Sequence, residues 1–288
     1  MTMPVMLPFL LLGCSATPSF VVLLDPDPAR DGLNGADGPY GAIATSRRYQ
    51  ARVTDAIRAE IVLPSDETDS PAISAAPTVV FVQGGLVDVD RYRWLYTHFA
   101  SRGYAVIAPY HALDLAIFDI GNASDALAGA RADPQLGDSI GDSAAVGGHS
   151  LGGVVAVKNW LADDSFSALF LLASFPAAGD DPTARTGSPV LSIAGDNDQK
   201  ALPADVRAGF ERFGDPRYLA MVDDLNHYGW TDGATEKELA SDGAAATLDA
   251  DRIAALTVID AFLDASLRGD ATAVERLDQP FDGVTVSR

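Results

Sequence analysis

The chain has 288 residues, 48% of them apolar, which is enough to bury one sizeable core and excludes a disordered protein. Its 40 acidic and 20 basic side chains give a formal net charge of −20, and a surface of that sign repels phosphate backbones. We therefore expect a globular protein without a nucleic-acid partner, in which the acid surplus serves solubility. Because Cys14 is the single cysteine, no disulfide within the chain is possible.

The first 14 residues have the pattern of a bacterial lipoprotein signal. An apolar run ends in Leu-Leu-Gly-Cys, and in this interpretation the peptide is cut before Cys14, whose thiol carries a lipid. We then expect an exported protein, tethered to a membrane by that lipid and facing the periplasm or the cell exterior. No Lys or Arg precedes the run and two prolines interrupt it, so the alternative is a plain apolar tail or a misplaced start codon, and a cytoplasmic protein.

The expected domain organisation has three parts. Residues 1–14 are the candidate signal peptide, and residues 15–39, rich in Asp, Pro, Gly and Ala, are a tether with a short strand over 20–24. Residues 40–288 form the folded domain.

Short apolar runs alternate with helical patterns along that domain. Residues 51–64 predict antiparallel edge strands, and the continuous apolar run 78–83 is typical of a strand buried on both faces. A helix is predicted over 92–103, where apolar residues recur with helical spacing and Gly103 marks the stop. Further strands are expected at 104–109, 144–148, 168–173, 189–195 and 217–222, and helices at 119–131, 151–162, 204–213 and 251–267. The alternation of strands and helices predicts an α/β fold with a doubly wound, mostly parallel sheet and helices on both faces. In such a fold, ligands bind at the carboxyl ends of the strands.

Residues 148–152, GHSLG, form a G-x-S-x-G sequence between a predicted strand and a predicted helix. This is the setting of a nucleophile elbow, in which the glycines leave room for a tight turn and the serine adopts a strained backbone conformation. The amides at the start of the helix would favour an anion beside the serine. Ser150 is therefore the candidate nucleophile, and the alternative is a glycine-rich turn without chemistry.

A serine nucleophile requires a base, and the chain has four histidines. His98 lies on a predicted helix as a packing or surface residue. His149 is inside the turn and too constrained to reach back, and His111 lines the rim at best. His227 directly follows the strand predicted at 217–222, so it lies at the carboxyl end of the sheet and is the candidate base.

The carboxylate that orients the base should follow a strand between the nucleophile and the base. The strand predicted at 189–195 ends in glycine, and Asp196 and Asp198 come directly after it. Asp180 and Asp181, one strand earlier, are outside candidates.

The strand predicted at 78–83 ends in Gln83-Gly84-Gly85-Leu86. Two glycines allow a backbone N–H to turn toward the site, which an oxyanion hole requires. We assign the amides of Gly85 and Leu151 to that hole. A plain β-turn at the two glycines is the alternative.

Together these segments resemble the α/β-hydrolase superfamily, in particular bacterial dienelactone hydrolases, chlorophyllases and polyester hydrolases. The resemblance covers about residues 40–277 and rests on TVVFVQGG, LYTHFASRGYAVIAP, GGHSLGG, PVLSIAGDND, NHYGW and TVIDAFLDASLRGD. It implies an α/β-hydrolase fold with Ser150 as nucleophile, Asp198 as acid and His227 as base, and it makes Asp196 a turn or cap residue. Two departures are visible: Gln83-Gly84 replaces the His-Gly that often opens the oxyanion loop, and a serine replaces the cysteine of dienelactone hydrolases.

The segment 174–188 is too short for the helical cap of many lipases, so we expect an open, shallow site without a large cap domain. We expect a carboxylic ester hydrolase that forms an acyl-enzyme on a small-molecule or polymeric ester, with no metal or organic cofactor. The alternatives are the same triad acting on amides, thioesters or in perhydrolysis, and a non-catalytic binding lipoprotein on this fold. The candidate walls of the site are Leu86, Tyr110, Phe175, Tyr228 and Trp230, and the alternative for each aromatic side chain is a place in the core.

Overall fold

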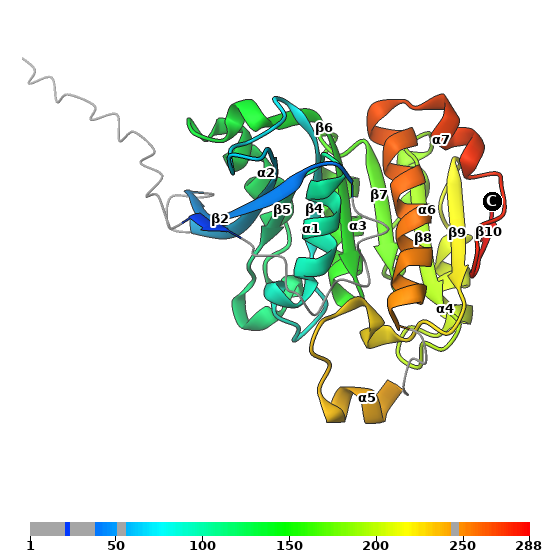
Figure 1. The fold of residues 1–288 in the computed structure, drawn as a ribbon. Helices are drawn as coiled ribbons and strands as arrows, with labels where there is room; N and C mark the ends of the chain where they lie inside the picture. Colours follow the sequence, from blue (N-terminus) through cyan, green and yellow to red (C-terminus); the bar gives the residue numbers. More distant parts are fainter. Residues whose placement is uncertain (1–20, 24–37, 51–55, 243–247) are drawn as a thin grey trace, which may run out of the picture.

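The computed structural model describes residues 21–23, 38–50, 56–242 and 248–288. Its strands form one sheet in the order β1-β2-β3-β5-β4-β6-β7-β8-β9-β10 (Figure 1). These strands are β1 (Val21–Leu23), β2 (Gly41–Gln50), β3 (Ala56–Ser65), β4 (Ala76–Val82), β5 (Ala105–Pro109), β6 (Ile140–His149), β7 (Ala168–Leu172), β8 (Val190–Gly195), β9 (Arg217–Val222) and β10 (Val284–Ser287).

The central strands β5, β4, β6, β7, β8 and β9 pair in parallel, and the outer pairings are antiparallel. The predicted doubly wound, mostly parallel sheet is therefore confirmed. The carboxyl ends of the parallel strands point toward the lower end of the molecule in Figure 1, where α5 lies. The helices are α1 (Arg93–Ser101), α2 (Asn122–Ala132), α3 (Leu151–Ala162), α4 (Pro203–Phe210), α5 (Glu236–Asp242), α6 (Leu248–Arg268) and α7 (Ala271–Arg276).

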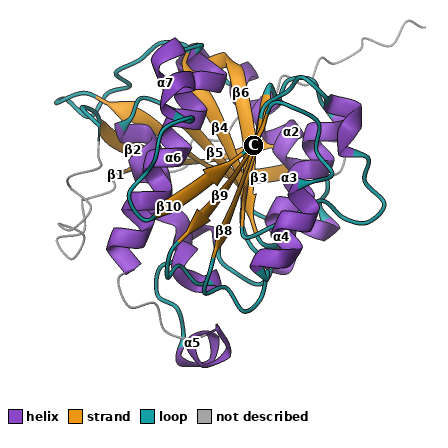
Figure 2. Ribbon diagram, turned by 90° about the vertical axis from the view of Figure 1, so that its right-hand side faces the viewer, coloured by secondary structure: helices purple, strands orange, loops and turns teal. Residues whose placement is uncertain are grey.

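Helices cover both faces of the sheet (Figure 2). Successive side chains of β4 point to opposite faces, so Val79 and Phe81 pack in the core that includes α1 and α6, whereas Val80 and Val82 pack in the core that includes α2 and α3. Burial on both sides explains why the central strands read as continuous apolar runs rather than as alternating patterns.

Several elements differ from the sequence-based expectation. β3 is antiparallel as predicted but is not an edge strand, because β2 and β1 continue the sheet beyond it. The prediction also lacked β2, β10, α5 and α7. Between β7 and β8 the chain forms only loops and a 3-10 helix, Pro182–Arg185, so the expected lack of a large cap at this point is confirmed.

Part of the predicted N-terminal organisation lies outside the described residues, including Cys14 and most of the tether. β1 falls within the short strand expected over 20–24. Among the described residues, no helix has both the length and the apolar character that crossing a membrane demands.

Candidate active site

Ser150 occupies a sharp turn between the end of β6 and the start of α3. Its backbone has φ 53° and ψ −124°, a conformation that non-glycine residues rarely adopt. The turn is held by a hydrogen bond from the Ser150 amide to the carbonyl of Leu172, 3.0 Å away. The Ser174 hydroxyl donates to the Ser150 carbonyl across 2.7 Å. These contacts fix the strained serine against β7 and the residues that follow it.

The glycines on either side of Ser150 make the turn possible, as the sequence predicted. A Cβ on Gly148 would lie 2.5 Å from the carbonyl carbon and oxygen of Gly152. A Cβ on Gly152 would overlap the carbonyl oxygens of Val82 and Gln83 at the end of β4. The first turn of α3 can therefore approach β6 and β4 this closely only with hydrogen at both positions.

The loop after β8 carries Asp198, which is 1% exposed. Its Oδ1 accepts hydrogen bonds of 2.7 Å from the amides of Lys200 and Ala201. A Cβ on Gly195 would overlap the carbonyl oxygen of Leu225, in the loop that carries the histidine. The glycine that ends β8 thus lets the two loops pass in contact.

His227 follows β9 and connects the other two side chains. Its Nδ1 and the Asp198 Oδ2 are 2.8 Å apart, and its Nε2 and the Ser150 Oγ are 2.9 Å apart. With a carboxylate at one ring nitrogen, Nδ1–H donates to Asp198 and Nε2 accepts the hydroxyl proton of Ser150. Three side chains separated by up to 77 residues in sequence form one continuous hydrogen-bonded chain.

The other acids weighed from the sequence lie elsewhere. Asp196 is exposed and accepts a hydrogen bond of 2.7 Å from the amide of Asp224, so it connects the acid loop to the loop after β9. Asp180 forms an ion pair with Lys158 at 2.7 Å, and Asp181 caps the 3-10 helix Pro182–Arg185.

Gly85 and Leu151, whose amides are assigned to the oxyanion hole, are neighbours in space. A Cβ on Gly85 would be 3.0 Å from Cδ2 and 3.3 Å from Cβ of Leu151. Leu151 is the first residue of α3, where backbone amides have no acceptor within the helix. Residues 83–86, which follow β4, form the oxyanion loop. Its last residue, Leu86, has φ 61°, and its amide donates to the carbonyl of Asp114 across 2.7 Å.

A buried pair supports the start of this loop. Nδ1 of His111 and Oε1 of Gln83 are 2.8 Å apart, and burial lowers the pKa of His111 to about 4. The neutral imidazole therefore donates from Nδ1 to the Gln83 carbonyl oxygen. The expectation that His111 lines the rim is wrong, because its side chain is buried against Gln83.

A second buried pair joins the oxyanion loop to the elbow. The Gly84 amide donates to the Tyr92 hydroxyl across 2.9 Å, and that oxygen lies 2.8 Å from Nδ1 of His149. Because the hydroxyl accepts from Gly84, it donates to His149, whose pKa burial holds well below its ordinary value. The ring of His149 lies 4.6 Å from that of His227. The sequence analysis missed Tyr92, since a helical apolar pattern carries no signal for a hydroxyl contact.

The candidate wall residues differ in their exposure to solvent. Leu86 is 72% exposed, and Tyr110, Phe175 and Tyr228 are partly buried, with the Tyr110 hydroxyl donating to Glu60 at 3.0 Å. Trp230, expected at the site or in the core, is 0% exposed and belongs to the core. The 3-10 turn His227–Trp230 directs the chain into that core, where the Trp94 indole donates to the Trp230 carbonyl.

His98, assigned to packing or the surface, is buried with its Nε2 3.0 Å from Asp260. Within the described part of the chain, no three His, Cys, Asp or Glu side chains are grouped so that they could hold a metal ion.

Comparison with known proteins identifies one family. The model of the alpha/beta hydrolase family matches residues 78–245, more than half of the chain. The match runs from β4 through the turn at Ser150 and includes the loops that carry Asp198 and His227. No curated protein matches the sequence.

Proposed function

The chain belongs to the alpha/beta hydrolase family, and we propose that it is a serine hydrolase that cleaves carboxylic esters through an acyl-enzyme intermediate. The observation that carries the proposal is the continuous contact from Ser150 Oγ through His227 to Asp198, with distances of 2.9 and 2.8 Å. A serine hydroxyl is a weak nucleophile at neutral pH, and a hydrogen-bonded imidazole oriented by a carboxylate activates it.

Each group has a defined role in the proposed reaction. His227 Nε2 takes the proton of Ser150 as Oγ attacks the ester carbonyl, and Asp198 stabilises the resulting imidazolium. The oxyanion accepts hydrogen bonds from the Gly85 and Leu151 amides. The imidazolium then protonates the departing alkoxide, and a water activated by His227 releases the acid from Ser150.

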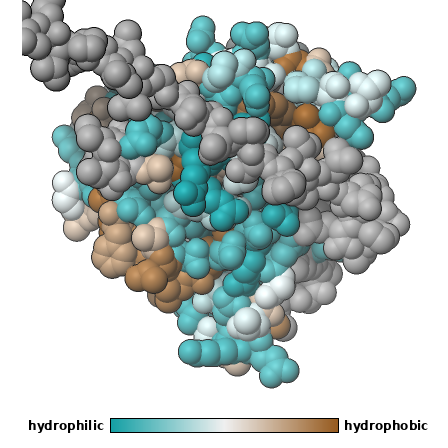
Figure 3. Space-filling model, turned by 90° about the vertical axis from the view of Figure 1, so that its left-hand side faces the viewer, coloured by the Kyte–Doolittle hydropathy of each residue, from teal (hydrophilic) through white to brown (hydrophobic). Residues whose placement is uncertain are grey.

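We further propose that the substrate is an uncharged ester with an apolar group. Three apolar side chains are 67–79% exposed: Leu86 in the oxyanion loop, and Leu113 and Phe118 in the segment after β5. A hydrogen bond from the Leu86 amide to the Asp114 carbonyl ties the two segments together. Part of the apolar surface in Figure 3 lies at the lower left of the face, in the half of the molecule that holds the site. The net charge of −20 disfavours anionic esters by repulsion.

A fluorophosphonate probe and a series of p-nitrophenyl esters test the reaction. We expect the probe to label the protein and Ser150→Ala to abolish labelling, and His227→Ala to lower kcat by at least about 1,000-fold. Labelling that persists in Ser150→Ala, or a loss below tenfold in His227→Ala, would remove these residues from the mechanism. Amide, thioester and peroxide arms of the same assay separate ester hydrolysis from the alternative chemistries of the triad.

The finer assignments also stand as proposals. We propose membership of the group around dienelactone hydrolases, chlorophyllases and polyester hydrolases on the motifs that resemble them, and lipid attachment at Cys14 with export on the Leu-Leu-Gly-Cys pattern.

A further inference from the structure

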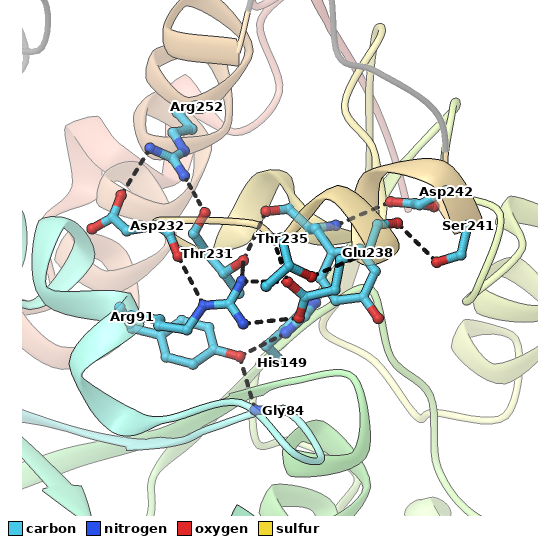
Figure 4. Close-up of polar contacts among 12 residues, drawn as sticks. Gly84, Arg91, His149, Thr231, Asp232, Thr235, Glu238, Ser241, Asp242 and Arg252 are labelled. Carbon is cyan, nitrogen blue, oxygen red and sulfur yellow. Dashed lines mark hydrogen bonds and ion pairs between the residues drawn. The ribbon is translucent and has the colours of Figure 1, made fainter.

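Helix α5 carries two carboxylates on one face. Glu238 and Asp242 are four residues apart, which places them on the same side of the helix. Glu238 contacts Arg91, and Asp242 contacts the loop that carries the base (Figure 4). Asp242 also contacts the loop that carries the acid. The sequence analysis assigned no role to this helix.

Asp242 connects the two loops through their backbones. Its side chain is buried, at 1% exposure. Oδ1 accepts a hydrogen bond of 2.9 Å from the amide of Gln199, the residue after Asp198. Oδ2 accepts one of 3.1 Å from the amide of Tyr228, the residue after His227. One carboxylate therefore holds the neighbours of both groups that meet in the 2.8 Å contact between Asp198 and His227.

The other carboxylate anchors the helix to the far side of the site. Glu238 accepts two hydrogen bonds from the guanidinium of Arg91, at 2.8 and 3.1 Å. Arg91 also donates to the Thr231 hydroxyl and the Asp232 carbonyl. It lies beside Tyr92, whose hydroxyl receives the Gly84 amide of the oxyanion loop. The helix thus contacts segments adjoining the acid, the base and the oxyanion loop.

We propose that Asp242 is a positioning residue that sets the spacing of the Asp198 and His227 loops. The inference rests on the proposed function of the triad. An ionised carboxylate offers acceptors to both amides, whereas an asparagine offers an acceptor to one and turns an NH2 group toward the other. A buried donor then loses its partner, and the loops separate or rotate to satisfy it.

The test compares Asp242→Asn with Glu236→Gln, which removes one carboxylate from an exposed position of the same helix. We expect Asp242→Asn to lower kcat by about 10- to 100-fold with KM changed less than about threefold. The rate at which the fluorophosphonate labels Ser150 should fall in proportion, and Glu236→Gln should match the unmodified protein. Equal kcat and labelling rates in the two variants, or a loss confined to KM, would overturn the proposal.

Two further measurements keep the inference testable by itself. The proton shared by His227 and Asp198 is expected to give a far-downfield NMR signal, which can be recorded without turnover. Asp242→Asn should shift or broaden it, and an unchanged signal would overturn the inference.

If Asp242→Asn does not fold, Glu238→Gln is the second variant. It loosens the opposite end of the helix and should lower kcat at least about threefold. An unchanged kcat would count against the proposal. Unmodified protein without Ser150-dependent labelling would instead refute the proposed function.

Discussion

Replacing Gly148 by alanine is expected to slow catalysis while the protein stays folded. A Cβ at this position would lie 2.5 Å from the carbonyl carbon and oxygen of Gly152 and 2.7 Å from the amide nitrogen of Gly153. Real Cβ atoms essentially never come within 3.0 Å of such atoms. The contacts are backbone atoms in the first turn of α3, so this turn must move away from β6 by about 0.5 Å, the difference between 3.0 and 2.5 Å.

The displacement reaches the reacting groups directly, because Ser150 and the Leu151 amide lie between Gly148 and that turn. A misplacement of about 1 Å can cost about 100-fold in rate. If the loss in activation free energy scales with the displacement, half that distance costs about tenfold. Overpacking in a close-packed interior costs about 1–3 kcal/mol, which lowers the unfolding midpoint by about 2–12 °C in a domain of this size.

The assay measures kcat on a p-nitrophenyl ester, the rate of fluorophosphonate labelling and the thermal midpoint. The matched control is Gly179→Ala, where an added Cβ would meet nothing within 4 Å, and this variant should behave as the unmodified protein. A kcat for Gly148→Ala within twofold of the control would refute the reasoning, since the elbow would then have room that the geometry denies.

Two further predictions concern pH. Hydrogen bonds from Arg91 lower the pKa of Glu238 to about 2. The ionised Glu238 therefore contributes its full stabilisation above its ordinary pKa of about 4.5, and this contribution is lost as the pH falls toward 2. In chemical denaturation, the difference in unfolding free energy between the unmodified protein and Glu238→Gln should shrink across that pH range. A difference that stays constant would contradict the ion pair. Burial lowers the pKa of His111 to about 4, so NMR should find this ring neutral at pH 5.5 with its proton on Nδ1, and titration near 6.5 would contradict the buried contact with Gln83.

The sheet could be predicted from the sequence where its strands are buried on both faces. Those strands are uninterrupted apolar runs, and the predicted strand at 217–222 and helix at 151–162 match β9 and α3 at both ends. β2 was missed because its ten residues mix exposed, intermediate and buried positions, with the buried Arg47 paired to Asp133 at 3.3 Å. A buried cation looks like a surface residue in a sequence pattern, since its partner lies far away in the chain.

In the site, too, the sequence does not reveal contacts between residues that are far apart in the chain. Ser150, Asp198 and His227 could be proposed because each follows a strand, and the carboxyl ends of parallel strands share one edge. Tyr92 and Asp242 could not, because their contacts cross 57 and 43 residues of chain and depend on side-chain direction. Motif reasoning finds groups aligned with strand ends and misses those that reach the site from a neighbouring helix.

The loops that form the site are joined to one another by hydrogen bonds outside the triad. The oxyanion loop is joined to the elbow through Tyr92, and the acid loop is joined to the base loop through Asp242 and through Asp196 with Asp224. The triad geometry is thus set by backbone contacts and by buried groups behind it, which is what electrostatic preorganisation requires. It follows that removing a triad side chain should end the chemistry and leave the fold in place, whereas removing a connecting group should leave the chemistry in place at a reduced rate. These two classes of variant separate the groups that react from the groups that hold them.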